Sequence, residues 1–234
     1  RMKINIFYGV EGAKKAEGLA VIIDVFRVFS LECYMMDRGA KKIIPVADKD
    51  LAYLLKERNP EFLLVGERNG KMLEGFDYGN SPTQMEKADL KDKIIVHTTS
   101  SGTQGLANAI HAKEVITGSL VNAKAIVEYI TQRGYEEVSL VCMGWNGKEQ
   151  TDEDNLCAEY IKSMLENKEI NMEEKISELK ETNGAKFFDK EKQEIFPEND
   201  FYYCTAINKF NFVLLLKKVT DDIKWIQKVE LKKQ

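Results

Sequence analysis

The chain has 234 residues, of which 44% are hydrophobic and 31% charged, a balance typical of a folded protein with a full apolar core. Its formal net charge is −4, so we expect no nucleic-acid surface and no anionic-membrane surface, and we expect basic residues to act only locally. The four cysteines form no CxxC pair and the apolar runs are too short to cross a bilayer, which favours a reduced, cytoplasmic protein without structural zinc.

Strands and helices are predicted to alternate along most of the chain. We predict strands at residues 3–8, 20–25, 42–46, 62–65, 94–96, 114–117, 138–143 and 212–217. We predict helices at residues 29–38, 48–58, 121–133, 153–168 and 198–208, a helix from residue 106, and a short helix opened by Ser81-Pro82. This alternation indicates an α/β fold in three layers, α/β/α, with a mostly parallel or mixed sheet.

Two stretches carry weaker patterns. Residues 166–194 are rich in Lys and Glu, and we interpret them as a charged helical insertion with a solvated face and a loop at Asn183-Gly184. The final twenty residues are polar, and no element is predicted there. We interpret residues 1–234 as a single domain or as two closely packed α/β lobes.

A turn rich in hydroxyl groups and glycine follows the strand at 94–96. Residues 98–105 read TTSSGTQG and lead into a predicted helix. The first N–H groups of a helix have no partner within the helix, and glycine lets the backbone approach a ligand, so this turn predicts an anion-binding cradle. An ordinary strand-to-helix turn capped by Thr103 is the alternative. The turn contains no lysine, so it is not a P-loop.

Carboxylates and arginines follow the other strands. Asp24 lies at the end of the strand at 20–25 and Arg27 follows it, Glu67 and Arg68 follow the strand at 62–65, and Asp154 follows the strand at 138–143. Ligands bind outside the carboxyl ends of parallel strands, so we expect these side chains at one edge of the sheet. Carboxylates with few histidines favour Mg²⁺, and arginines favour phosphate, so the pattern indicates phosphoryl transfer.

Each of these residues also has a purely structural interpretation. Asp24 is of a type that caps turns, and Glu67 with Arg68 is of a type that forms surface ion pairs. Asp154 is placed to complement the dipole of the helix that it begins. Cys157, in the first turn of that helix, is either a nucleophile or, more commonly for this residue type, a small buried side chain.

Several segments together resemble a known family. They are VIIDVFRVFS (21–30), GERNG (66–70), GFDYGNSP (75–82), TTSSGTQG (98–105), GWNG (144–147) and EDNLCA (153–158), and they resemble the 2-phosphosulfolactate phosphatase family, also called the ComB family. The resemblance implies a Mg²⁺-dependent phosphatase that hydrolyses (2R)-2-phospho-3-sulfolactate to 3-sulfolactate and phosphate, a step towards coenzyme M. It also implies a three-layer α/β/α fold with the topology of that family.

The resemblance implies the residues of the site as well. Asp24, Arg27, Glu67, Arg68 and Asp154 are among the site residues that it implies. We expect Asp24, Arg27, Glu67 and Arg68 to be catalytic, and Asp24, Glu67 and Asp154 to hold Mg²⁺ directly or through water. The substrate-binding residues that it implies are Asn80, Ser81, Thr99, Ser100, Gly102, Thr103 and Asn122. Ser101 and Gln104 differ from the residues common in the family, which leaves the exact substrate open.

Other functions remain open at this stage. One is a phosphatase for another small anionic phosphate monoester, and another is a non-catalytic sensor of phosphorylated or sulfonated metabolites. Water attacks the phosphate directly, or Asp24 forms a phosphoenzyme; the sequence does not choose between these two routes. A homodimer is the default expectation for the assembly.

Overall fold

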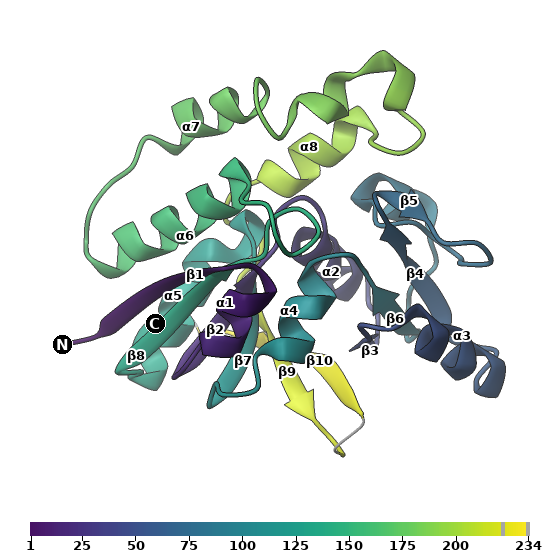
Figure 1. Ribbon diagram of the computed structural model, residues 1–234, viewed down its shortest axis with the longest axis horizontal. Coiled ribbons are helices and arrows are strands. Elements are labelled where there is room, and N and C mark those ends of the chain that lie inside the picture. The colour runs from purple at the N-terminus through teal and green to yellow at the C-terminus, as the bar shows by residue number, and fades with distance from the viewer. Residues whose placement is uncertain (221–222, 233–234) are drawn as a thin grey trace.

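A ten-stranded mixed sheet forms the centre of the molecule (Figure 1). The computed structural model describes residues 1–220 and 223–232. The strand order is β1-β8-β2-β7-β9-β10-β3-β6-β4-β5. Helices pack against both faces of this sheet, which confirms the predicted three-layer α/β/α architecture.

The elements have the following bounds. The strands are β1 (Lys3–Tyr8), β2 (Leu19–Ile23), β3 (Lys42–Pro45), β4 (Leu63–Arg68), β5 (Lys71–Met72), β6 (Ile94–Thr98), β7 (Glu114–Gly118), β8 (Glu137–Cys142), β9 (Phe212–Lys218) and β10 (Lys224–Glu230). The α-helices are α1 (Gly9–Lys15), α2 (Val28–Asp37), α3 (Lys49–Arg58), α4 (Gly102–Asn108), α5 (Ala123–Arg133), α6 (Asp152–Leu165), α7 (Met172–Leu179) and α8 (Glu198–Thr205). The 3₁₀ helices are η1 (Pro82–Lys87), η2 (Leu120–Asn122), η3 (Ala185–Phe188) and η4 (Lys190–Lys192).

Two groups of parallel strands make up most of the sheet. One group is β1, β8, β2 and β7, and the other is β3, β6 and β4. The antiparallel hairpin β9–β10 lies between them and pairs with each group through one residue pair, Ile116↔Leu215 on one side and Ile226↔Ile43 on the other. Within the sheet, as far as the chain is described, the two parallel groups are therefore joined through this hairpin.

Each face of the sheet carries its own apolar core. On one face, α2 and α4 bury Leu31 and Leu106 in the same cluster as the strand residues. On the other face, α5 and α6 bury Ile126 and Ile161, while α3 buries Ala52 in a smaller cluster over β4 and β6. Burial of such side chains typically contributes about 1.5–3 kcal/mol each, so these clusters hold the strand ends in fixed positions.

Most predicted elements are present with ends shifted by a few residues, and three differ more. The helix α1 was not predicted, because its sequence GVEGAKK contains two glycines, which are poor helix formers. Its Gly12 lies close to Phe7, where a Cβ would come within 2.9 Å of the Phe7 Cβ atom. The helix predicted from residue 106 begins at Gly102 and ends at Asn108, and β4 continues through Glu67 to Arg68.

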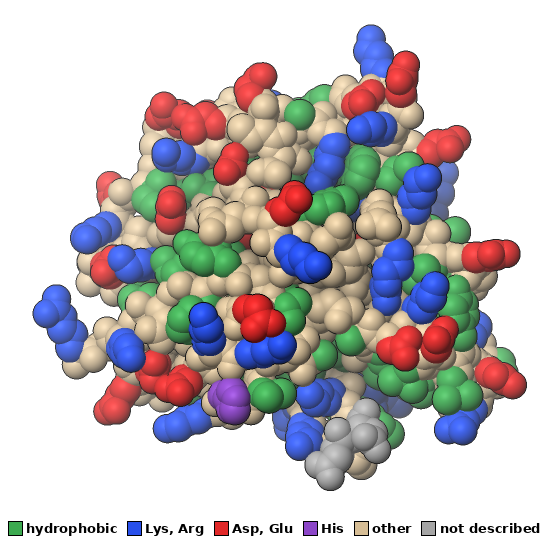
Figure 2. Space-filling model, in the orientation of Figure 1, with side chains coloured by type: hydrophobic (Ala, Val, Ile, Leu, Met, Phe, Trp, Pro, Cys, Tyr) green, Lys and Arg blue, Asp and Glu red, His purple; other side chains and the backbone are tan. Residues whose placement is uncertain are grey.

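The charged segment and the end of the chain also differ from expectation. Within residues 166–194, Met172, Leu179 and Phe187 are buried, so the segment is not only a solvated face. In Figure 1, α7 and α8 lie along the top of the view, near α6, and Figure 2 shows acidic and basic side chains interspersed over this part of the surface. The final twenty residues contain β10, and residues 221–222 and 233–234 of that stretch lie outside the described residues. Among the described residues, no helix is both long enough and apolar enough to span a bilayer.

Candidate active site

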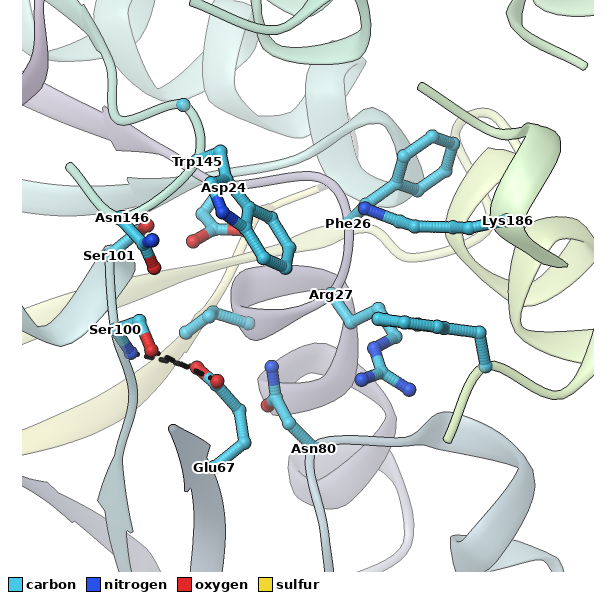
Figure 3. A pocket seen from close by; sticks show the side chains of 13 residues that line it. Asp24, Phe26, Arg27, Glu67, Asn80, Ser100, Ser101, Trp145, Asn146 and Lys186 are labelled. Carbon is cyan, nitrogen blue, oxygen red and sulfur yellow. Dashed lines mark hydrogen bonds between the residues drawn. The ribbon is translucent and has the colours of Figure 1, made fainter. Parts of the chain in front are cut away.

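A polar pocket lies where β2, β4, β6 and β8 end (Figure 3). The carboxyl ends of parallel strands are where α/β proteins bind ligands, so the position agrees with the sequence-based expectation. The side chains of Ser100 and Ser101 reach it because the loop after β6 runs into α4, which packs against β2 and α1. The lining residues are Asp24, Phe26, Arg27, Val28, Glu67, Asn80, Ser100, Ser101, Gly144, Trp145, Asn146, Lys186 and Phe196.

Asp24 is the carboxylate at the centre of this arrangement, and only 3% of it is exposed. Gly102 lies against it, since a Cβ at that position would come within 3.1 Å of Asp24 Oδ2. Burial raises the pKa of Asp24 well above its ordinary value, and the charges of Asp154, Glu153 and Glu67 raise it further. This concentration of negative charge favours either a proton or a bound cation at Asp24.

Glu67 also lines the pocket, but both of its oxygens are already hydrogen-bonded. Oε1 accepts from the backbone N–H of Ser100 at 2.7 Å. Oε2 accepts from the backbone N–H of Gly70 at 2.8 Å. It also accepts from Ser100 Oγ at 3.0 Å (Figure 3). Glu67 therefore ties the turn after β4 to the turn after β6, and it holds Ser100 at the pocket wall.

Asp154 joins two other turns. Its Oδ1 accepts from the backbone N–H of Val25 at 2.9 Å, and its Oδ2 accepts from the backbone N–H of Gly144 at 2.8 Å. Burial raises the pKa of Asp154 to about 6 although these two hydrogen bonds lower it. Its neighbour Glu153 is also buried; burial first, and then the charge of Asp154, raise the pKa of Glu153 to about 8.

The three carboxylates expected to bind a metal are not assembled as a ligand set. Across residues 1–220 and 223–232, no group of three or more His, Cys, Asp and Glu side chains could hold a metal ion. Both carboxylate oxygens of Asp154 and of Glu67 already accept hydrogen bonds from neighbouring groups. Asp24 is therefore the carboxylate of these three that is best placed to contact a cation. Mg²⁺ is commonly held by one or two carboxylates with water and phosphate oxygens, so this chemistry fits Mg²⁺ at Asp24.

Arg27 is held in the pocket by an ion pair and by backbone carbonyls. Its Nη1 donates to Asp200 Oδ2 at 3.0 Å and to the carbonyl of Ile195 at 2.8 Å, and its Nη2 donates to the carbonyl of Gly70 at 3.3 Å. Both side chains are almost fully buried, at 4% and 0% exposure. Asp200 was not identified from the sequence, and it determines where the guanidinium of Arg27 lies.

Two residues expected to bind substrate take part in the supporting structure instead. Ser81 donates to Asp200 Oδ1 at 2.9 Å, and the backbone N–H of Thr83 donates to the same oxygen at 2.8 Å. Asn122 donates to the carbonyl of Phe212 at 3.2 Å and accepts from Ser119 Oγ at 3.0 Å. Neither Ser81 nor Asn122 lines the pocket.

The two threonines of the predicted cradle are hydrogen-bonded to each other. The backbone N–H of Thr99 donates to Thr103 Oγ1 at 2.9 Å, and that of Thr103 donates to Thr99 Oγ1 at 3.2 Å. These reciprocal bonds give the backbone N–H groups of both threonines a partner within the turn. Neither threonine lines the pocket. Gly102 makes room for Asp24, and only Ser100 and Ser101 of this turn face the pocket.

Arg68 lies beside the pocket rather than in its wall. Its Nη1 donates to the carbonyl of Glu67 at 2.8 Å. Its Nη2 donates to the carbonyl of Ala47 at 3.1 Å and to Thr98 Oγ1 at 3.0 Å. Arg68 therefore joins the ends of β4 and β6 and does not line the pocket, so the structure gives no contact for its expected catalytic role.

Asn80 lines the pocket at the end of a buried chain of hydrogen bonds. Its Oδ1 lies 3.0 Å from His97 Nε2, and His97 Nδ1 lies 2.7 Å from Glu32 Oε2. Burial raises the pKa of Glu32, and its Oε1 has no hydrogen-bond partner in the described part of the chain. With the carbonyl of Asn80 facing His97, the amide nitrogen of Asn80 is directed into the pocket (Figure 3).

Sequence reasoning missed the side chains that close the other side of the pocket. Lys186 and Phe196 come from the segment after α7, and Trp145 comes from the turn after β8. The charge pattern around Lys186 is that of a solvated surface, so no sequence signal separates it from its exposed neighbours. Its position depends on how residues 166–205 fold over the strand ends.

The cysteines do not contribute a nucleophile. All four are buried and unpaired, and Cys157 does not line the pocket. Burial raises the pKa of Cys157 well above its ordinary value, which disfavours the reactive thiolate. Cys157 is therefore a packing residue of α6.

The fold and the pocket together define an α/β protein with carboxylates, hydroxyls and cations gathered at the strand ends. A family model described as 2-phosphosulpholactate phosphatase matches residues 8–219. A protein of Bacillus subtilis (strain 168) named "Probable 2-phosphosulfolactate phosphatase" is 31% identical over 221 residues, covering 93% of this chain and 95% of that protein.

Proteins with the same name occur in other bacteria. The one from Clostridium perfringens (strain SM101 / Type A) is 31% identical over 234 residues, covering 92% of this chain and 94% of its own length. The one from Caldanaerobacter subterraneus subsp. tengcongensis is 33% identical over 211 residues, covering 84% and 87%. The chain therefore belongs to the 2-phosphosulfolactate phosphatase family of phosphoric monoester hydrolases, and the family assignment made from the sequence is confirmed.

Proposed function

We propose that this protein hydrolyses (2R)-2-phospho-3-sulfolactate to 3-sulfolactate and phosphate, with Mg²⁺ as its cofactor. The observation that carries the proposal is the buried Asp24, surrounded by other carboxylates, in a pocket that also holds Arg27 and Lys186. A phosphate ester needs both kinds of group, because its own charge must be neutralised while a nucleophile is positioned. The family of the chain supports the same reaction.

Each pocket residue has a role in this proposal. Asp24 would hold Mg²⁺ directly and Glu67 would do so through water; the bound ion supplies charge neutralisation at the phosphate oxygens. Ser101 Oγ, which accepts from the backbone N–H of Gly147 and keeps its own O–H to donate, and the amide nitrogen of Asn80 are donors for phosphate oxygens. Arg27, fixed by Asp200, places positive charge where the transferred group develops negative charge.

The first prediction concerns Asp24. Asp24→Asn removes the charge while keeping the shape, so we expect phosphate release to fall by about 10²- to 10⁴-fold. Phosphate release from 2-phospho-3-sulfolactate is measured with added Mg²⁺ and with EDTA. Asp50→Asn, a change on the exposed face of α3, is the matched control and should retain full activity. Near-normal turnover of Asp24→Asn, or full activity of the parent protein in EDTA, would refute the proposal.

The same assay separates the remaining alternatives. Faster hydrolysis of another small phosphate monoester would keep the reaction class and replace the substrate. Absence of turnover on every ester, combined with tight binding, would indicate a sensor. Rapid acid quench during turnover would trap a phosphorylated Asp24 if the route passes through a phosphoenzyme, and its absence would favour direct attack by water.

A further inference from the structure

The pocket has an acidic side and a basic side. In Figure 3, Asp24, Ser100 and Glu67 lie on the left of the view, and Arg27 and Lys186 lie on the right. The acidic side suits a cation with its bound phosphate, whereas the basic side suits an anionic group without a metal. A substrate that fills both sides must therefore carry negative charge at two separate places.

Arg27 is not the free cation of the basic side. Its charge is matched by the buried carboxylate of Asp200 at 3.0 Å, and its N–H groups also donate to the carbonyls of Ile195 and Gly70. These contacts fix the position of the guanidinium and reduce the number of its N–H groups that can donate to a ligand. They leave Lys186 as the more available charge on this side.

Lys186 is held among aromatic rings, and no carboxylate of the described residues lies at contact distance from it. Its Nζ lies 4.7 Å from the ring centroid of Trp145, 5.2 Å from that of Phe196 and 5.7 Å from that of Phe187. Among residues 1–220 and 223–232, no hydrogen bond or ion pair is made by this ammonium group. Cation–π contacts hold a cation in place without neutralising it, so Lys186 keeps an unused charge at the pocket.

We infer that Lys186 binds a second anionic group of the substrate, a carboxylate or a sulfonate, while the phosphate lies on the side of Asp24. This inference rests on the proposed function and names the residue that recognises the second charge of its substrate. Trp145 and Phe196 orient the ammonium group, and they exclude water from the ion pair that the ligand forms.

A structural role for Lys186 makes a different prediction. The charges of Glu153, Asp24 and Asp154 act on Lys186 through space, so the lysine could serve only to balance these carboxylates. In that case, removing its charge would weaken every anionic ligand alike. In our proposal, removing the charge of Lys186 weakens the binding of 3-sulfolactate more than the binding of inorganic phosphate.

Calorimetric titration with 3-sulfolactate and, separately, with inorganic phosphate distinguishes the two roles in the Mg²⁺-supplemented protein. We expect Lys186→Met and Lys186→Gln to weaken 3-sulfolactate binding by about 10- to 100-fold, the size of one charge-assisted hydrogen bond, and to weaken phosphate binding several-fold less. Lys190→Met changes an exposed lysine of the same segment and is the matched control. Thermal unfolding of each variant shows whether it is folded.

The outcomes are separable from those of the proposed function. Equal losses of affinity for 3-sulfolactate and phosphate, or unchanged 3-sulfolactate affinity in a folded variant, would overturn the inference. Neither result would contradict the proposed phosphatase function. Failure of the parent protein to bind 3-sulfolactate would overturn the inference too. Loss of the proposed function would instead appear as absent phosphate release by the parent protein, which the binding titration does not measure.

Discussion

Arg27 lies in the pocket because Asp200 holds it there. Asp200 is fully buried and accepts hydrogen bonds from Arg27, from Ser81 Oγ and from both the backbone N–H and the hydroxyl of Thr83. A buried ion pair adds little stability compared with apolar packing, but removing one partner leaves the other charge uncompensated. The sequence around Asp200 carries no sign of this role, since its partners lie far along the chain.

The second prediction concerns this carboxylate. Asp200→Ala removes the acceptor of three neighbouring side chains, so we expect a loss of about 3–5 kcal/mol in the free energy of unfolding. Urea denaturation monitored by circular dichroism measures it. Glu198→Ala, an exposed change in the same helix, should stay within about 0.5 kcal/mol of the parent. A loss below about 1 kcal/mol for Asp200→Ala would contradict the importance of the Arg27 pair.

Among the elements, α4 begins in a glycine-containing turn that resembles a ligand-binding cradle, but its glycines allow close packing of α4 against its neighbours. Gly102, at its start, lies where a Cβ would come within 2.8 Å of Val28 Cγ1 and 3.1 Å of Asp24 Oδ2. Gly105, one turn later, lies close to Met143 and Ile22, away from Asp24. Gly102 lets α4 approach α2 and Asp24, whereas Gly105 lets α4 approach β2.

The third prediction uses this difference. Gly102→Ala and Gly105→Ala should each cost about 1–3 kcal/mol of stability, because both overpack a close contact. Only Gly102→Ala should also reduce kcat, by tenfold or more, since it displaces Asp24. Steady-state phosphate release at a temperature where both variants are folded checks this. A comparable fall in kcat for both variants would show that the helix acts only through general stability.

The residues at the strand ends were predictable from the sequence, but the position of residues 166–205 over them was not. Asp24 and Glu67 directly follow apolar runs, so strand periodicity alone located them at the pocket. The partners of Thr99 and Thr103 were not predictable, because a hydroxyl serves equally as a ligand donor or as a cap. Lys186 was missed because its burial comes from tertiary contacts of a segment with a surface-like composition.

For the molecule as a whole, the buried carboxyl groups determine how stability depends on pH. Burial raises the pKa of Asp154 to about 6 and of Glu153 to about 8, and it raises the pKa of Asp24 and Glu32. In the unfolded chain these groups titrate near pH ~4, so between pH ~4 and ~8 the folded state binds more protons than the unfolded state. The free energy of unfolding therefore falls as the pH rises through this window.

The fourth prediction follows from that sign. In EDTA, the stabilising contribution of these groups should be fully present below pH ~4 and should be lost as the pH rises to ~8, with a slope of up to about 1.4 kcal/mol per pH unit for each proton. Glu153→Gln should flatten the upper part of this dependence, whereas Glu159→Gln, exposed on the same helix, should not. Urea denaturation at a series of pH values measures it. An unchanged slope in Glu153→Gln would contradict the raised pKa of Glu153.

The hairpin β9–β10 has a consequence for how the protein is made. It occupies the middle of the sheet between β7 and β3, yet residues 212–230 are the last of the described strands to leave the ribosome. Until they emerge, β7 and β3 each present an open edge whose backbone groups have no partner. The two half-sheets therefore expose these edges to other chains for as long as the hairpin is missing, and a chain truncated before residue 212 should aggregate more readily than the full chain.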